Sequence, residues 1–218
     1  MRIITCIFFY LLLWLHCSSQ QSLRDSLLTL ANNEVGVIET SENNGPRVKE
    51  YIYSCGFNYP VPWCACFLTY IFKQLSLNYP AFPARAASWT SSNAYKNKYD
   101  AIEGDVFTIF YPNLNRVGHG GLIEAKDADY IYTIEGNTNN NILDGGDYDG
   151  DRVMKKLRPW ATLHKTANWV GDYYHIVQPG DNLYRISLKY KVSVEAIKKA
   201  NNITNNYIRV GDKLYVPN

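Results

Sequence analysis

The sequence predicts an α+β fold, in which helices pack on one face of an antiparallel β-sheet, followed by a small βααβ module. Apolar residues recur at helical spacing in the first part of the chain, whereas residues 105–157 contain short extended runs. Helices that precede strands joined by short turns favour this layered arrangement. A chain of 218 residues is long enough for one substantial core and a small second unit.

Helices are expected first and strands afterwards. Residues 22–30 are amphipathic and begin with a serine that suits a helix N-cap. A second helix follows the turn at residues 43–46 and stops at Gly56. The prolines between residues 80 and 89 predict a loop with at most a short helix. Extended segments are expected at residues 105–110, 118–124, 130–135 and 152–157.

A third helix is expected to begin near Cys64. Its apolar face comprises Cys64, Phe67, Leu68, Ile71 and Leu75. Because a proline just ahead of such a run suits a helix start, Pro62 places Cys64 in the first turn. Unpaired backbone N–H groups and the positive end of the helix dipole favour a thiolate there, which makes Cys64 a candidate nucleophile. Cysteines on apolar helix faces usually serve packing, and we interpret Cys66 in that way.

The overall composition excludes little but argues against nucleic acid as a partner. The formal net charge is +2, and no dense run of lysine and arginine occurs. The 18 tyrosines and 5 tryptophans supply aromatic surface that can stack on sugars or peptides.

Residues 1–19 are predicted to be a secretory signal peptide. Arg2 precedes an apolar run that is shorter than the ~20 residues of a membrane span, and small residues follow near Ser19. We therefore expect no stable membrane span and a secreted, periplasmic or cell-envelope location. One alternative is a bacterial lipoprotein modified at Cys17, although His16 is a poor match to the small residue that precedes such sites. Another is a short membrane anchor through an uncleaved segment.

Export changes the interpretation of the remaining cysteines. Without the signal peptide, Cys55, Cys64 and Cys66 are left, and an odd number in an oxidising compartment implies one free thiol. A disulfide between Cys55 and Cys66 would leave Cys64 free, but the spacing alone does not demonstrate it.

No metal or cofactor is expected from the sequence. Paired C-x-x-C motifs and sets of histidine and cysteine at zinc-ligand spacing do not occur. Acidic residues in a glycine-rich loop resemble the start of a calcium loop: Asp144, Asp147, Asp149 and Asp151. However, Arg152 replaces the glycine that an EF-hand requires and Arg158 replaces the closing glutamate, so an ordinary polar turn is favoured.

His119 is the strongest candidate for the general base. It is flanked by Gly118, Gly120 and Gly121, which we expect to keep the imidazole open to a cleft. The next strand ends at Glu135-Gly-Asn-Thr, so either Glu135 or Asn137 could bond the far nitrogen of His119 and fix its tautomer.

Residues 22–169 resemble the CHAP amidohydrolase/peptidase family, papain-like cysteine hydrolases of bacterial cell-wall peptides. The motifs are Pro-Trp-Cys64-Ala-x-Phe, Gly-His119-Gly-Gly and Glu135-Gly-Asn137-Thr, with further landmarks at Gly45, residues 84–89 and residues 104–106. The resemblance implies that Cys64 is the nucleophile, that His119 is the base, and that Glu135 or Asn137 orients it. Two features depart from the family: Gly120 stands where a β-branched residue is common, and the calcium loop of some relatives is absent.

Residues 174–218 form the predicted βααβ module, after a linker at residues 170–173. A strand, two capped helices and a final strand are expected, with the outer strands paired. The pattern His175-x-Val-x-Pro-Gly-Asp181-Asn-Leu183 and the ending Val210-Gly-Asp-x-Leu-x-Val-Pro closely resemble the LysM module. This resemblance implies binding of glycans that contain N-acetylglucosamine. The candidate contacts are Asp181, Asn182, Leu183, Asn205, Tyr207 and Ile208.

Together these features predict an exported peptidoglycan hydrolase that cleaves an amide bond and is anchored to glycan by LysM. The bond could be that of an N-acetylmuramoyl-L-alanine amidase or of a stem-peptide or cross-bridge endopeptidase. One alternative is a non-catalytic cell-wall binding protein with an inactive hydrolase domain. Another is a general protein-degrading cysteine protease.

Overall fold

The computed structural model describes residues 21–139, 150–170, 173–190 and 192–216. The chain divides into two compact units, one ending at Val170 and the other beginning at Gly171. The predicted signal peptide with Cys17 and the aspartates at positions 144, 147 and 149 lie outside the described residues.

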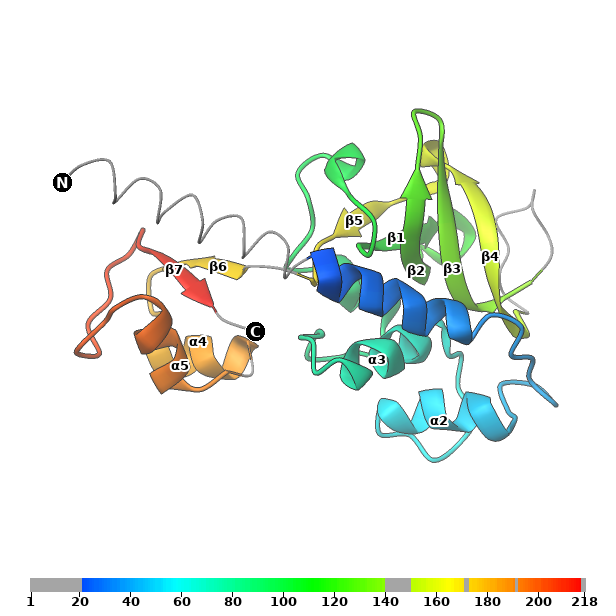
Figure 1. Ribbon diagram of the computed structural model, residues 1–218, viewed down its shortest axis with the longest axis horizontal. Coiled ribbons are helices and arrows are strands. Elements are labelled where there is room, and N and C mark those ends of the chain that lie inside the picture. The colour runs from blue at the N-terminus through cyan, green and yellow to red at the C-terminus, as the bar shows by residue number, and fades with distance from the viewer. Residues whose placement is uncertain (1–20, 140–149, 171–172, 191, 217–218) are drawn as a thin grey trace. The chain divides into compact units, whose positions relative to one another are not determined.

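A five-stranded antiparallel sheet forms the centre of the first unit (Figure 1). The strands are β1 (Val106–Tyr111), β2 (Arg116–Lys126), β3 (Tyr130–Thr138), β4 (Arg152–Pro159) and β5 (Lys165–Ala167). Their order is β4-β3-β2-β1-β5, so β1 to β4 follow one another in sequence and in space. This arrangement confirms the predicted fold class, and the short strand β5 extends the sheet beyond the prediction.

Helices cover one face of this sheet (Figure 1). They are the helix of residues 21–33, α2 (Pro46–Ser54) and α3 (Cys64–Gln74). Short 3-10 turns occur at η1 (Ala86–Thr90), η2 (Lys98–Asp100), η3 (Pro112–Leu114) and η5 (Trp160–Thr162). The helix α3 begins at Cys64, as its position after Pro62 predicted.

Side chains alternate between two buried clusters on the two faces of the sheet. Val106 and Leu122 pack in the cluster that includes the helices, whereas their neighbours Phe107 and Ile123 pack in a second cluster with Trp160. This alternation follows from the two-residue period of a strand. Both faces of the sheet are therefore buried, and the central strands are fixed from both sides.

The helix α3 approaches β3 closely because Gly136 has no side chain. A Cβ atom at Gly136 would lie 2.6 Å from Cβ of Phe67 and 2.9 Å from Cζ3 of Trp63. Contacts that short do not occur between real atoms, so glycine is needed where the helix crosses the strand. The start of α3 is thereby held against the sheet.

The second unit pairs β6 (Tyr173–Ile176) with β7 (Lys213–Val216) in antiparallel fashion. Between them lie α4 (Leu183–Tyr190) and α5 (Val194–Ala200), and Ser193 caps α5 by accepting a hydrogen bond from the N–H of Ala196. Its core consists of Val177, Leu183, Ile186, Ile197, Leu214 and Val216. The predicted βααβ order is therefore observed.

In the described part of the chain, no helix combines the length and apolar character needed to cross a membrane. Among those same residues, no group of three or more histidine, cysteine, aspartate or glutamate side chains is arranged to hold a metal ion. Asp151, from the acidic loop, pairs with Arg152 at 2.6 Å.

Candidate functional site

Cys64 is the first residue of α3, and its side chain lies against β2. The residue is 6 % exposed, and its Sγ lies 3.9 Å from the carbonyl oxygen of Gly118. As the first helical residue, Cys64 has a backbone N–H that has no acceptor within the helix. The site therefore combines a thiol, a free helix N-terminus and a neighbouring strand.

His119 joins Cys64 at this point and contacts Glu135 on the next strand. Nε2 of His119 lies 2.8 Å from Oε2 of Glu135, and the Cys64 side chain lies close enough to the imidazole to raise its pKa. Because Nε2 is bonded to Glu135, Nδ1 is the nitrogen left for the thiol. The expectation that glycines keep the imidazole open to a cleft was wrong, since His119 is only 1 % exposed.

The glycines around His119 allow close packing. A Cβ atom at Gly121 would lie 2.8 Å from Cγ of Glu135 and 2.9 Å from Cε1 of Phe107. A Cβ atom at Gly118 would lie 2.2 Å from Cδ2 of Tyr111. Glycine at these positions therefore lets Glu135 and an aromatic ring approach β2 directly.

Glu135 is held by a buried network that the sequence analysis did not find. Arg158 of β4 donates from Nε and from an Nη atom to the two carboxylate oxygens, each at 2.5 Å. The hydroxyl of Thr133 donates to Oε1 at 2.5 Å. Glu135 is fully buried and Arg158 is 6 % exposed, so this bidentate ion pair is shielded from water.

These contacts shift both titratable groups of the pair. Burial alone would lower the pKa of His119, but hydrogen bonds to Cys64 and Glu135 outweigh it and raise the pKa to about 10. Burial would raise the pKa of Glu135, but the charge and hydrogen bonds of Arg158, with His119, hold that pKa well below its usual range. These contacts thus favour a protonated imidazole beside the ionised carboxylate of Glu135.

Asn137, the alternative orienting residue, does not occupy that position. Glu135 takes the far nitrogen of His119, whereas Asn137 lies two residues further along β3, with a left-handed φ of 55°. Its Oδ1 is buried and has no hydrogen-bond partner among the residues that the structure describes. Glu135 is therefore the group that fixes the tautomer of the imidazole in this structure.

A groove with a volume of about 350 Å³ opens beside Cys64. We call it the Cys64 groove, and it is lined by Phe57, Val61, Pro62, Cys64, Ala84, Arg85, Ala86, Ala87, Arg116, Val117 and Gly118. Its walls come from the loop before α3, the segment before η1 and the start of β2. An extended peptide could reach the thiol here, whereas His119 lies beneath the surface.

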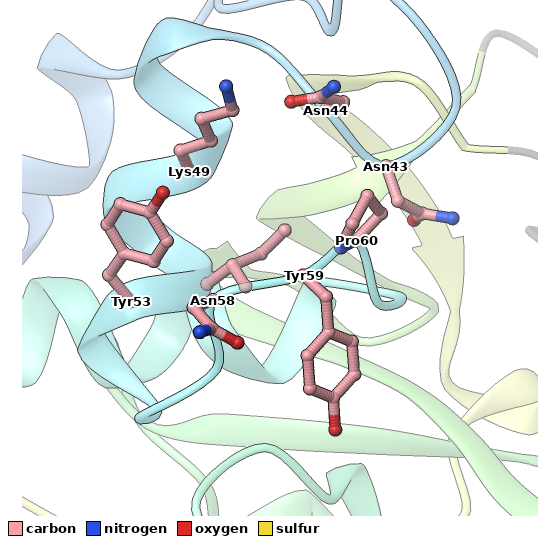
Figure 2. Close-up of a pocket in the computed structure, with 8 residues that line it drawn as sticks. Asn43, Asn44, Lys49, Tyr53, Asn58, Tyr59 and Pro60 are labelled. Carbon is pink, nitrogen blue, oxygen red and sulfur yellow. The ribbon is translucent and has the colours of Figure 1, made fainter.

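A second cavity of about 250 Å³ lies between α2 and the segment that follows it (Figure 2). Lys49 and Tyr53 project into it from α2, and Asn58, Tyr59 and Pro60 line the other side. Residues 57–62 thus contribute to both cavities, because Phe57, Val61 and Pro62 line the Cys64 groove.

Cys55 and Cys66 are both free thiols in the structure, and their side chains form a hydrogen bond with each other. This hydrogen bond lowers the pKa of Cys55 to about 7, although burial opposes the shift. Cys66 is completely buried, which agrees with the packing role predicted for it. The disulfide considered from the sequence is therefore not formed here, although the two side chains are in contact.

In the second unit, three of the predicted glycan contacts use their side chains within the protein. Asp181 accepts a hydrogen bond from the N–H of Gln178 and lies 2.6 Å from Nε2 of His175. Asn182 Oδ1 accepts from the N–H of Arg185 and so caps α4. Leu183 is 2 % exposed and belongs to the core. Their backbone groups, together with the exposed amide of Asn182, remain accessible to a ligand.

The other three predicted contacts precede β7 and are more accessible. Asn205 Oδ1 accepts from the N–H of Tyr207, which fixes the turn. Tyr207 is 68 % exposed, with the guanidinium of Arg209 lying 5.7 Å from its ring centre. Ile208 packs partly against the core. Tyr207 is therefore the aromatic side chain of this set that is available for stacking.

Comparison with known proteins identifies the second unit. The model of the LysM domain matches residues 175–217. A Xenopus laevis protein described as "LysM and putative peptidoglycan-binding domain-containing protein 1" is 50% identical over 44 residues. That match covers 20% of this chain and 20% of the relative, so the chain corresponds to about a fifth of that protein. The C-terminal unit is a LysM domain, as its sequence pattern predicted.

Comparison of structures finds two crystal structures of Ly7917, one of them determined with the hydrolyzing product of MDP. The first match covers 71% of this chain and 66% of that chain, with 13% identity and a TM-score of 0.35. The second covers 70% and 64%, with 12% identity and the same TM-score of 0.35. Similarity at this level carries no argument about the function of the first unit.

Proposed function

We propose that this protein is an exported peptidoglycan hydrolase that cleaves an amide bond through Cys64 and His119. The observation that supports it most strongly is the arrangement of Cys64, His119 and Glu135 beside an open groove. The LysM domain adds a second argument, because it assigns the chain a role in binding the cell wall. The CHAP-like motifs around these residues agree with the same activity.

In the proposed reaction, the Cys64 thiolate attacks the carbonyl carbon of the scissile amide. The backbone N–H of Cys64, unused at the helix start, lies where it can donate to the oxyanion that forms. His119, protonated through its raised pKa, then gives its proton to the leaving amine as the C–N bond breaks.

The resulting thioester is released by water. His119 is left neutral after the first step, so it can take a proton from the attacking water and return to the imidazolium form. The Cys64 thiolate leaves as the C–S bond breaks, and the product carries a new carboxylate. Throughout both steps Glu135, itself fixed by Arg158, keeps the same imidazole nitrogen bonded.

The LysM domain is proposed to hold the enzyme on its polymer. A glycan-binding module linked to a hydrolase raises the effective concentration of the substrate, so weak binding of a single sugar is sufficient. Export through the predicted signal peptide would bring both units to the cell envelope.

The experiment that tests the proposal is mass analysis of products from purified peptidoglycan. Digestion by the full chain should release new amino groups, and Cys64→Ala should release none. The masses would also identify the bond and so distinguish an amidase from an endopeptidase. Equal product patterns for the two proteins would exclude the proposed chemistry.

Two other functions predict different results. A non-catalytic cell-wall binding protein would bind peptidoglycan through LysM and give no Cys64-dependent product. A general cysteine protease would cleave casein at a rate comparable with that on purified cell wall. Parallel assays on both substrates separate these cases from the proposed activity.

A further inference from the structure

We propose that Arg85 and Arg116 form a carboxylate-binding subsite in the Cys64 groove, so that the peptide cleaved there is acidic. This inference rests on the proposed function and specifies its substrate class. It comes from the distribution of charge among the residues that line the groove.

Among the described residues, those that line the groove carry positive charge and include no carboxylate. Arg85 and Arg116 are the charged side chains that line it, and the other lining residues are apolar, glycine or Cys64. Both arginines are exposed. A peptide that enters the groove therefore meets two cations on otherwise apolar walls.

The other arginines that the structure describes in this unit are all paired. Arg24 bonds Asp105, Arg47 bonds Glu34, Arg152 bonds Asp151 and Arg158 bonds Glu135. Within the described residues, the guanidinium groups of Arg85 and Arg116 have no such partner. The arginines without a carboxylate are thus the two that line the groove.

Both arginines are attached to ordered backbone close to the nucleophile. Arg85 precedes η1, whose Ala86 and Trp89 are buried, and Trp89 donates to the carbonyl oxygen of Pro83 at 2.9 Å. Arg116 begins β2 only two residues before Gly118, whose carbonyl contacts Sγ of Cys64. The two cations therefore line the same groove as Cys64 from segments far apart in sequence.

A guanidinium suits a carboxylate because its planar N–H groups can donate two parallel hydrogen bonds. A phosphate could satisfy the same donors. The apolar remainder of the groove and its amide-cleaving nucleophile favour a peptide, with a carboxylate near the scissile bond, as the ligand. Inorganic phosphate therefore serves as the competing ligand in the binding experiment.

Direct binding to the full-length Cys64→Ala protein tests the subsite without cleavage. The probes are a sugar-free stem peptide from peptidoglycan with free carboxylates and the same peptide amidated at every carboxyl group. Removal of the sugar keeps the LysM domain from contributing. We expect the free acid to bind about tenfold more tightly than the amide, a preference that weakens as salt concentration rises.

Each of Arg85→Gln and Arg116→Gln should reduce this preference about threefold, and the double variant should abolish it. Lys96→Gln is the matched control, because it removes one exposed positive charge of the same unit outside the groove. That control should keep the full preference, and 10 mM inorganic phosphate, roughly a physiological concentration, should not remove it.

Three results would overturn the subsite: equal affinity for the two peptides, a preference that survives the double variant, or binding of neither peptide. If inorganic phosphate at about 10 mM displaced the free-acid peptide, the two arginines would be assigned to a phosphate ligand instead. Failure of the proposed hydrolysis would appear separately, as the absence of Cys64-dependent products from peptidoglycan.

Discussion

At the scale of single residues, Glu135 connects the candidate catalytic groups to the rest of the sheet. Its carboxylate accepts hydrogen bonds from Arg158 and Thr133 and bonds His119, and all four side chains are buried. A buried charge of this kind is stable only while its partners remain in place. Glu135 therefore has two roles: it holds the imidazole of His119, and it neutralises the buried charge of Arg158. Substitutions can separate these roles.

Glu135→Gln should remove the negative charge that raises the pKa of His119 and leave Arg158 buried without a counter-charge. We expect activity on peptidoglycan to fall about 100-fold or more, because the imidazolium loses its stabilising partner. Stability should fall by about 3–5 kcal/mol, measured by denaturant unfolding.

A double variant separates the loss of activity from the loss of stability. In Glu135→Gln with Arg158→Met, no unpaired buried charge remains, so much of the lost stability should return while activity stays low. Glu124→Gln is the control, since it breaks the more exposed pair with Lys155 on the same sheet. Full activity in Glu135→Gln would show that Glu135 does not act on His119.

At the scale of elements, the same side chains link three neighbouring strands. His119 belongs to β2, Glu135 to β3 and Arg158 to β4, so their contacts add to the backbone hydrogen bonds between these strands. The stability of this part of the sheet should therefore depend on the protonation of His119 and Glu135.

The sign of each contribution follows from the direction of its pKa shift. The pKa of His119 rises from 6.5 to about 10 on folding, so its stabilising effect is complete below pH 6.5 and is lost as pH rises through 10. The pKa of Glu135 falls on folding from 4.5, so its effect is present above pH 4.5 and is lost at lower pH.

Denaturant unfolding at several pH values can measure these contributions. The stability difference between the wild type and His119→Gln should be largest near neutral pH and should shrink between pH 6.5 and 10. The slope should not exceed about 1.4 kcal/mol per pH unit, the limit for one proton. A difference that does not vary over this range would contradict the raised pKa of His119.

Sequence periodicity predicted most elements, but not the contacts between them. The helix start at Cys64 and four strands of the first sheet could be read from local patterns, whereas the three residues of β5 are too few to show a period. Arg158 directly follows the extended segment predicted at residues 152–157, and that local pattern gave no indication of its partner. Its pairing with Glu135 depends on strand register, which only the folded sheet provides.

For the candidate site as well, the sequence predicted the positions of residues better than their contacts. The positions of Cys64 and His119 stood out because of a helix start and a run of glycines, and the structure brings them together. Burial of the imidazole was missed, because glycine allows either an open cleft or close packing. In the LysM domain, Asp181 and Asn182 were named as glycan contacts from the resemblance alone, and the structure shows that both side chains also bond within the domain.

At the scale of the whole molecule, we propose that cleavage and binding belong to separate units. The first unit and the LysM domain have their own hydrophobic cores. Changes in one unit should therefore leave the chemistry of the other intact.

Tyr207→Ala tests this separation. Loss of the exposed ring should weaken binding of the full chain to chitin oligosaccharides about threefold to tenfold, because stacking on the sugar is removed. Cleavage of a soluble, sugar-free peptide should be unchanged. Leu188→Ala, which removes another exposed apolar side chain from the LysM domain, is the control and should bind normally. Equal binding by both variants would exclude Tyr207 from the glycan contact.

The most direct test of the central claim is the rate at which iodoacetamide alkylates Cys64 at neutral pH, with each labelled cysteine located by peptide mass mapping. Mapping is necessary because Cys55 and Cys66 are also free thiols. The account predicts rapid labelling of Cys64 in the wild type and labelling at least about tenfold slower in His119→Gln, since the imidazolium stabilises the reactive thiolate. Labelling of Cys64 at the same rate in both proteins would contradict it.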